Sequence, residues 1–199
     1  HVAPKRPAHF KPHPPESIVA ANLPPCMDVV DKVKALYNDA LAQGVAIRPP
    51  DVNTSRYRFE PVDSCSIRYG LGGIKGTGEA AIEAIVAARD AGGPFTDLFD
   101  FSRRIDNRIV NRRVVEALVR TGAFDAIDRR RAALFASVGL ALDAGERFAA
   151  TASQVSLFGD EAAPRMPTKG VVRDWTEGER LVHEKSSLGF YLSGHPFAA

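Results

Sequence analysis

The sequence has little cysteine and no long hydrophobic run. Its two cysteines, Cys26 and Cys65, lie far apart, with no C-x-x-C pair and no histidine at ligand spacing. We therefore interpret both as buried or free thiols and expect no disulfide framework and no metal site. No apolar run approaches the roughly 20 residues that a membrane helix needs, and no signal peptide is apparent. These absences favour a cytoplasmic protein with no membrane partner.

The sequence also has little net charge, only +2 over 199 residues, so total charge excludes few partners. The basic residues are nevertheless unevenly distributed, because arginines gather in the middle of the chain. Those that form this arginine-rich region are Arg103, Arg104, Arg108, Arg112, Arg113, Arg129, Arg130 and Arg131. Such a local basic field is typical of a nucleic-acid surface. A solvated helical face explains the arginines equally well.

The apolar periodicity predicts a mainly α fold with a small α+β segment near its start. Helices are expected over 16–22, 28–43, 80–91, 95–105, 128–142 and 176–188, with a further one that Asn111 caps and Thr121-Gly122 ends. Short strands are expected over 45–47, 56–60 and 66–69. From residue 144 the periodicity fades and glycine and proline interrupt, which predicts a linker.

A glycine-rich stretch, Arg68 to Glu79, comes directly before the helix expected over 80–91. Its five glycines are Gly70, Gly72, Gly73, Gly76 and Gly78. Glycine permits positive φ and lets a ligand approach the main chain without a Cβ in the way. Free N–H groups at a helix start bind anions. The stretch therefore predicts a phosphate-binding turn, although a tight helix connection without any ligand remains open.

Three phosphate-binding motifs compete for this stretch. If the dinucleotide-binding motif began at Gly70, Lys75 would stand where its third glycine belongs. Residues Gly76 to Ala81 fit a looser form of that motif, but helices follow them where the motif needs a second strand. In a P-loop the lysine follows the glycine, whereas here Lys75 precedes Gly76. A helix-hairpin-helix turn has an apolar-x-glycine-x-glycine core, which Ile74-Lys-Gly-Thr-Gly78 matches. Such turns hold a duplex by its backbone without reading its sequence.

A second and weaker hairpin is centred on Arg120-Thr-Gly-Ala-Phe124, which has one glycine. We expect the first hairpin to contact phosphate and arginines near both hairpins to add backbone electrostatics. The candidate DNA-binding residues are Lys75, Gly76, Thr77, Gly78, Arg112, Arg113, Arg120 and Gly122.

Several landmarks in series identify a family. They are Arg48-Pro-Pro-Asp-Val-Asn53, Tyr69-Gly-Leu-Gly-Gly-Ile-Lys-Gly-Thr-Gly-Glu79, Asn111-Arg-Arg-Val114, Thr121-Gly-Ala-Phe-Asp125 and Leu188-Gly-Phe-Tyr-Leu-Ser-Gly-His-Pro196. Together they resemble the alpha subunit of bacterial DNA polymerase III, in the right order from about Glu16 to Phe197.

The resemblance implies a fragment of a DNA-directed DNA polymerase, a nucleotidyltransferase. It implies the end of a fingers domain over 1–62, a tandem helix-hairpin-helix domain over 63–143, a linker over 144–175 and a helix over 176–199 leading toward an OB-fold domain. No closely spaced pair of aspartates with a third acid is present to hold two magnesium ions. The fragment is therefore expected to have no catalytic residue or cofactor, whereas the parent polymerase would use Mg²⁺.

The resemblance also implies that Gln154-Val-Ser-Leu-Phe158 is an internal sliding-clamp-binding peptide. Gln154, Ser156, Leu157 and Phe158 would contact the clamp, with the Leu-Phe pair as buried anchors. Packing of that pair onto the helical domain is the alternative. The implied partners are duplex DNA, the sliding clamp and other subunits of the replicative polymerase holoenzyme. A helical protein-interaction scaffold, the error-prone polymerase relative and a nucleotide-binding enzyme remain as alternatives.

Overall fold

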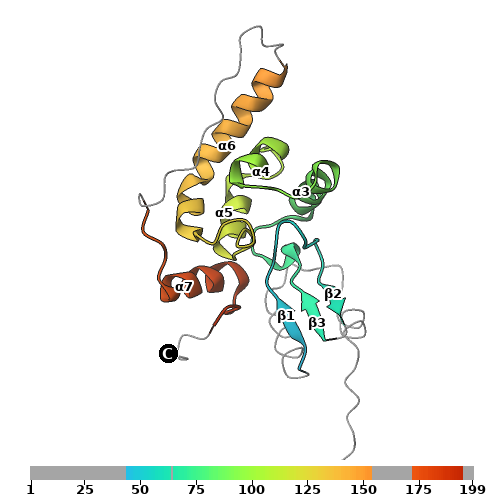
Figure 1. The fold of residues 1–199 in the computed structure, drawn as a ribbon, viewed down its shortest axis with the longest axis vertical. Coiled ribbons are helices and arrows are strands. Elements are labelled where there is room, and N and C mark those ends of the chain that lie inside the picture. The colour runs from blue at the N-terminus through green and yellow to red at the C-terminus, as the bar shows by residue number, and fades with distance from the viewer. Residues whose placement is uncertain (1–43, 64, 154–171, 195–199) are drawn as a thin grey trace, which may run out of the picture.

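The computed structural model describes residues 44–63, 65–153 and 172–194. A small sheet lies at one end of the described part with the last helix at the same level, the other helices gather above them, and one long helix extends beyond the rest (Figure 1). The elements are β1 (Ala46–Arg48), β2 (Glu60–Asp63), β3 (Ser66–Arg68), a 3-10 turn η1 (Leu71–Gly73), α3 (Glu79–Gly92), α4 (Leu98–Arg104), α5 (Arg112–Arg120), α6 (Arg131–Ser153) and α7 (Glu177–Leu188). The mainly α fold with a preceding small sheet is confirmed. The helices expected over 16–22 and 28–43 lie outside the described residues.

The sheet has the order β1-β3-β2, with β1 parallel and β2 antiparallel to β3. The strand expected over 56–60 is wrong, because the strand instead runs over Glu60–Asp63. The carbonyl groups of Arg56 and Tyr57 accept the N–H groups of Leu71 and Gly72. Residues before β2 therefore pair with the glycine-rich stretch and hold it against the sheet.

The turn over residues 51–55 joins the sheet to the helices. The N–H of Val52 donates to the carbonyl of Ala123, 2.9 Å away, and the guanidinium of Arg89 donates to the carbonyl groups of Val52 and Ser55. Asn53 exchanges two hydrogen bonds with the backbone of Phe95. Hydrogen bonds thus cross the domain boundary expected at residues 62 and 63.

The helices α3, α4 and α5 begin where local chemistry favours a start. Gly78 is the N-cap of α3, and the helix ends before Gly93, whose φ is +78°. The carboxylate of Asp97 accepts two N–H groups at the start of α4, so this helix begins later than expected. The side chain of Asn111 accepts the N–H of Val114, which confirms its capping role.

The helix α6 differs from its expected range at both ends. Asp128 does not start it, because its carboxylate accepts hydrogen bonds from the backbone and side chain of Arg130 in a turn. The helix continues to Ser153, well past Leu142. Residues 146–150 are all exposed, so no apolar periodicity could mark this part, although its alanines favour a helix. The segment expected as linker therefore begins as helix.

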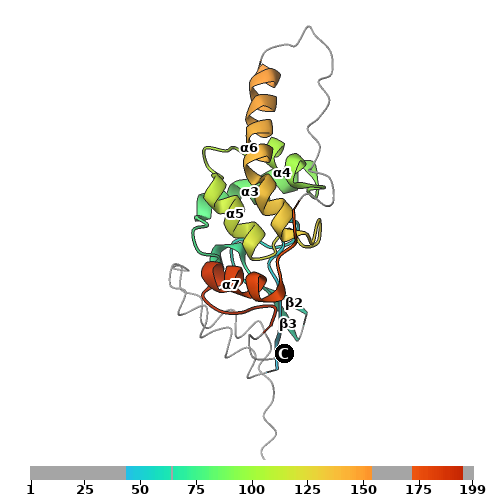
Figure 2. The same cartoon turned by 90° about the vertical axis from the view of Figure 1, so that its left-hand side faces the viewer.

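The helix α7 packs against α5, next to which it lies in Figure 2. Thr176 and Glu179 form a capping box at its start, and Gly189 ends it with φ of +88°. Leu181 and Leu188 are buried, as expected. Leu188 and Phe190 belong to the same hydrophobic core as the sheet and the other helices. The helix expected within 176–199 therefore packs onto the helical domain; that it leads toward an OB-fold domain stays a prediction.

Candidate nucleic-acid interface

The glycines of the stretch have two different roles. A Cβ on Gly70 would overlap the backbone of Tyr57 and Arg58, and one on Gly72 would overlap the ring of Tyr57. A Cβ on Gly73 would lie 2.8 Å from the hydroxyl of Tyr69. These three glycines are buried and allow close packing. They are not available to a ligand.

The hairpin turn, residues Ile74 to Gly78, is exposed at its tip and rigid below. Gly76 is exposed with φ of +83°, a conformation that favours glycine. The hydroxyl of the buried Tyr69 donates to the carbonyl of Gly73 at 3.0 Å, and burial raises the pKa of this phenol. Beneath the tip, the Thr77 hydroxyl lies 2.8 Å from the carbonyl oxygen of Leu71 and 2.6 Å from that of Ile74. The tip is therefore held in one conformation.

Thr77 does not have the arrangement expected of a phosphate ligand. Its side chain is buried, its hydroxyl faces carbonyl groups of the turn, and its N–H donates to the carbonyl of Ile74. Within the described part of the chain, no hydrogen bond uses the N–H groups of Gly76 or Gly78. Gly78 is exposed, and a Cβ there would meet nothing within 4 Å. The two glycines thus present free donors at the start of α3.

Two cations flank these donors. Lys75 is exposed at the tip, and its N–H donates to the carbonyl of Ser187 in α7. Arg113 lies on the first turn of α5, and its Cδ is 4.0 Å from the position a Cβ on Gly76 would take. Among the residues the structure describes, neither cation forms an ion pair. Lys75, Gly76, Gly78 and Arg113 form what we call the first-hairpin site.

The other two candidate arginines of α5, unlike Arg113, lie close to a carboxylate. Arg112 donates to Glu116 at 2.7 Å, and Arg120 lies 3.6 Å from the same carboxylate. The guanidinium of Arg120 also stacks over the ring of Phe135 at 4.8 Å. Glu116 therefore offsets part of the positive charge expected from Arg112 and Arg120.

Gly122 in the second hairpin is enclosed. Its φ is +80°, its N–H donates to the carbonyl of Val119, and a Cβ would overlap the guanidinium of Arg131. Glycine is thus required there by the shape of the connection. A contact between Gly122 and DNA remains a prediction that this arrangement does not support.

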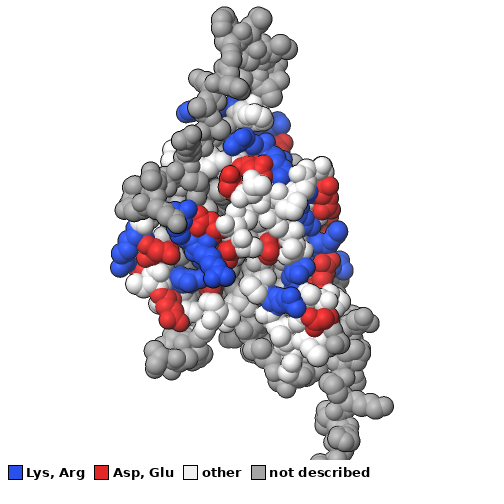
Figure 3. All heavy atoms as spheres, in the orientation of Figure 1, with Lys and Arg blue, Asp and Glu red and all other residues white. Residues whose placement is uncertain are grey.

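Much of the arginine-rich region serves the fold. Arg104 donates to the carbonyl groups of Ala88 and Gly93, and Arg131 is buried. Arg108 pairs with Asp106, whose pKa is lowered mainly by the hydrogen bond from the Arg108 N–H. On the face that Figure 3 shows, basic atoms of the described residues lie next to acidic ones instead of forming one continuous basic surface. The expected basic field is therefore reduced to local sites.

The remaining sequence expectations concern metals, membranes and the clamp. The described residues contain no group of three His, Cys, Asp or Glu side chains that could hold a metal ion. None of the helices in the same ranges is both long and apolar enough to cross a membrane. The side chain of Cys65 is exposed. The clamp-binding candidates Gln154, Ser156, Leu157 and Phe158 lie outside the described residues.

Residues 44–134 match the family model described as the helix-hairpin-helix motif. Over nearly its whole length the chain is also similar to alpha subunits of DNA polymerase III. It is 47% identical to that of Neisseria meningitidis serogroup B, over 96% of this chain and 17% of the relative. It is 42% identical to the Vibrio cholerae subunit and 40% to that of Escherichia coli K12, each over 94% of this chain and 17% of the relative. The resemblance inferred from the landmarks is confirmed, and the chain spans about a sixth of the length of these relatives.

Sequence reasoning missed one buried charged residue that contacts Arg131 after the second hairpin, Glu184. It is completely buried although it is charged. Its spacing from Leu181 and Leu188 places it on the apolar stripe of α7, which is the signal that could have revealed it.

Proposed function

We propose that this chain is part of a bacterial replicative DNA polymerase and that it binds duplex DNA without sequence specificity. The observation that carries the proposal is the first-hairpin site, with the free N–H groups of Gly76 and Gly78 between Lys75 and Arg113. The similarity to polymerase alpha subunits supports the same function.

The chemistry of this site suits a backbone phosphate. Free N–H groups at a helix start donate hydrogen bonds to an anion, and the helix dipole adds a favourable field. Lys75 and Arg113 supply charge on either side, and Arg113 can donate through a planar fork that matches phosphate. None of these groups is specific for a base, so binding is expected to be independent of sequence.

Titration of labelled duplex DNA by fluorescence anisotropy tests the proposal. Affinity should fall steeply between 50 and 200 mM salt, because neutralised phosphates release counterions. Lys75→Ala should weaken binding to all sequences equally and make the salt slope shallower by about one unit. Absence of binding by the wild-type chain at low salt would refute the DNA role.

Gly78→Ala isolates the phosphate contact from folding. Gly78 has φ of −76° and open space around it, so an alanine fits without a clash; as a poorer N-cap than glycine it costs the free protein roughly 0.5–1 kcal/mol, and binding is compared where both proteins are folded. In the complex the added methyl group would occupy the place of the phosphate, so affinity should fall. Gly178→Ala, also in open space but at the start of α7, is the matched control and should bind normally. Equal affinity of both variants would exclude Gly78 from the contact.

We further propose that Gln154, Ser156, Leu157 and Phe158 tether the polymerase to the sliding clamp. The support is the sequence of the peptide and its position between α6 and α7. The double variant Leu157→Ala with Phe158→Ala should lose clamp binding in surface plasmon resonance and keep its affinity for duplex DNA. Unchanged clamp affinity would refute this assignment.

In the longer polypeptide, polymerisation and its Mg²⁺ ions would belong to parts outside this chain. This chain would hold the duplex behind those parts, in the cytoplasm and together with other holoenzyme subunits. The isolated chain is therefore expected to show no nucleotide incorporation in a primer-extension assay.

A further inference from the structure

The helix α7 contacts both hairpins through two residues on one face. The carbonyl of Ser187 accepts the N–H of Lys75 from the first hairpin at 2.8 Å. Three residues earlier, the carboxylate of Glu184 accepts a hydrogen bond at 3.0 Å from Arg131, the first residue of α6, which follows the second hairpin. Residues three apart on a helix are neighbours on its surface. A single turn of α7 therefore links the two hairpins.

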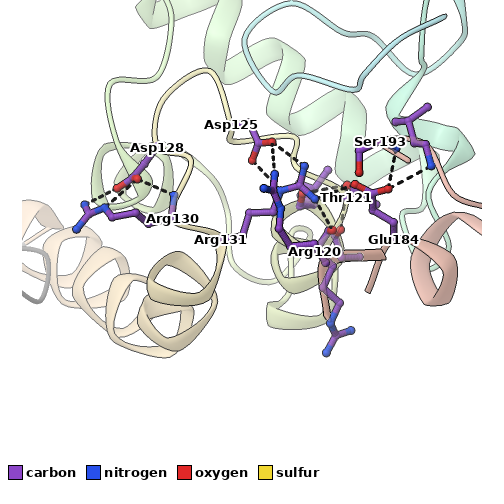
Figure 4. Close-up of polar contacts among 12 residues, drawn as sticks. Arg120, Thr121, Asp125, Asp128, Arg130, Arg131, Glu184 and Ser193 are labelled. Carbon is purple, nitrogen blue, oxygen red and sulfur yellow. Dashed lines mark hydrogen bonds and ion pairs between the residues drawn. The ribbon is translucent and has the colours of Figure 1, made fainter. Parts of the chain in front are cut away.

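The link to the second hairpin is a buried network (Figure 4). The side chains of Arg131 and Glu184 are only 5% and 1% exposed. Arg131 also donates to both carboxylate oxygens of Asp125, at 2.8 and 2.6 Å. Its guanidinium thus joins the loop of the second hairpin to α7.

The network continues into the chain that follows α7. The second oxygen of Glu184 accepts the N–H groups of Leu192 and Ser193, at 3.1 and 3.0 Å. Burial lowers the pKa of Arg131, but the hydrogen bonds and charges of Asp125 and Glu184 outweigh it and raise that pKa overall. Both charges of the pair are thus compensated by several partners. Networks that are fully satisfied hold their members in one arrangement.

We propose that α7 sets the spacing and orientation of the two hairpins and that Glu184 is a positioning residue acting through Arg131. The proposal rests on the proposed binding of duplex DNA. In the second hairpin the contact would come from the partly exposed Arg120, not from the enclosed Gly122. The phosphates of a duplex have a fixed spacing, so Lys75 and Arg120 reach them together only if the spacing of the hairpins is held. A hairpin that has to be ordered on binding contributes less affinity.

Substitution of Glu184 in the full 199-residue chain tests the proposal. Glu184→Gln keeps the shape, removes the charge and leaves one acceptor oxygen, which can serve either Arg131 or the N–H groups of Leu192 and Ser193 but not both. We expect about tenfold weaker duplex binding and a shallower salt slope, because fewer phosphates are neutralised at once. Leu142→Ala is the control: it removes core volume in α6 away from the hairpins, and its salt slope should equal that of the wild type at temperatures where both are folded.

Hydrogen exchange tests the positioning without DNA. The N–H groups of Ile127 and Asp128 donate to the carbonyl of Phe124 within the second hairpin. They should exchange faster in Glu184→Gln and at the wild-type rate in Leu142→Ala, after correction for global stability. If Glu184→Gln does not fold, Arg131→Lys serves instead, since it keeps the charge and loses the fork to Asp125.

The outcomes separate the two proposals. A wild-type chain that binds duplex DNA, together with a Glu184→Gln variant of unchanged slope and exchange, would overturn the positioning role alone. A wild-type chain that does not bind DNA would overturn the proposed function, and the role of α7 in binding with it. The double variant Lys75→Ala with Glu184→Gln is a further check. If the hairpins act together, its loss of binding free energy should differ from the sum of the two single losses; additive losses would argue against joint action.

Discussion

Gly145 lies where α6 crosses α4, and at the scale of single residues it shows how little room this crossing leaves. A Cβ on Gly145 would overlap the carbonyl oxygen of Ser102, which is backbone and cannot turn aside. We expect Gly145→Ala to lower the free energy of unfolding by about 1–3 kcal/mol in urea titrations. Gly178→Ala has free space and should change it by less than about 0.5 kcal/mol. A Gly145→Ala variant as stable as the wild type would contradict so close a crossing.

His183 provides a pH test at the same scale. Its ring lies 4.0 Å from that of Trp175, centroid to centroid. Burial and then the charge of Arg120 lower the pKa of His183, while Glu179 opposes them. In the unfolded chain the imidazole takes up its proton near pH 6.5, before the folded chain does. Stability should therefore fall as the pH decreases from about 7 to about 5.

The His183→Gln variant should lose this part of the pH dependence. Thermal melts of both proteins at several pH values across that window provide the measurement. The carboxylates of Asp63 and Glu179, whose pKa values are also lowered, affect stability only at lower pH. A variant with the same pH dependence as the wild type between pH 7 and 5 would show that His183 is not the responsible group.

At the scale of elements, the start of α5 connects stability to the candidate site. Asn111 accepts the N–H of Val114, and Arg113 of the first-hairpin site lies in the turn that this bond holds. Asn111→Ala should destabilise the chain by about 1 kcal/mol, whereas Asn111→Asp, which caps equally well, should not. Circular dichroism during urea unfolding measures the difference. Equal stability of the two variants would mean that the cap contributes nothing.

At the scale of the whole molecule, α7 is part of one cooperative unit with the sheet and the other helices. It buries Leu188 in the common core, is followed there by Phe190, and compensates the buried charge of Arg131. A chain that ends at residue 175 would expose this core and leave Arg131 without Glu184. We expect it to lose the single cooperative thermal transition of the full chain or to melt at a much lower temperature. An unchanged transition would place α7 outside the unit.

The sequence predicted best those features that depend on neighbouring residues. The glycine-rich turn, the start of α3 and the cap by Asn111 follow from the conformational freedom of glycine and from side chains that bind nearby N–H groups. The sequence was misleading where hydrogen bonds or packing join residues that are far apart in the chain. In the segment expected as a strand over 56–60, the carbonyl groups of Arg56 and Tyr57 bind the glycine-rich stretch instead of a neighbouring strand. The second part of α6 is exposed, so it has no apolar periodicity that could predict a helix.

By itself, the sequence determined the mainly α class, the turn that presents Gly76 and Gly78, and the resemblance to polymerase alpha subunits. Only the tertiary structure decided which cations remain available: Arg113 lies beside Gly76, whereas Arg131 is buried with Glu184, 53 residues away in the chain. The physical reason is that caps and turns are made by adjacent residues. The compensation of a buried charge depends on which elements pack together, and no local pattern encodes that.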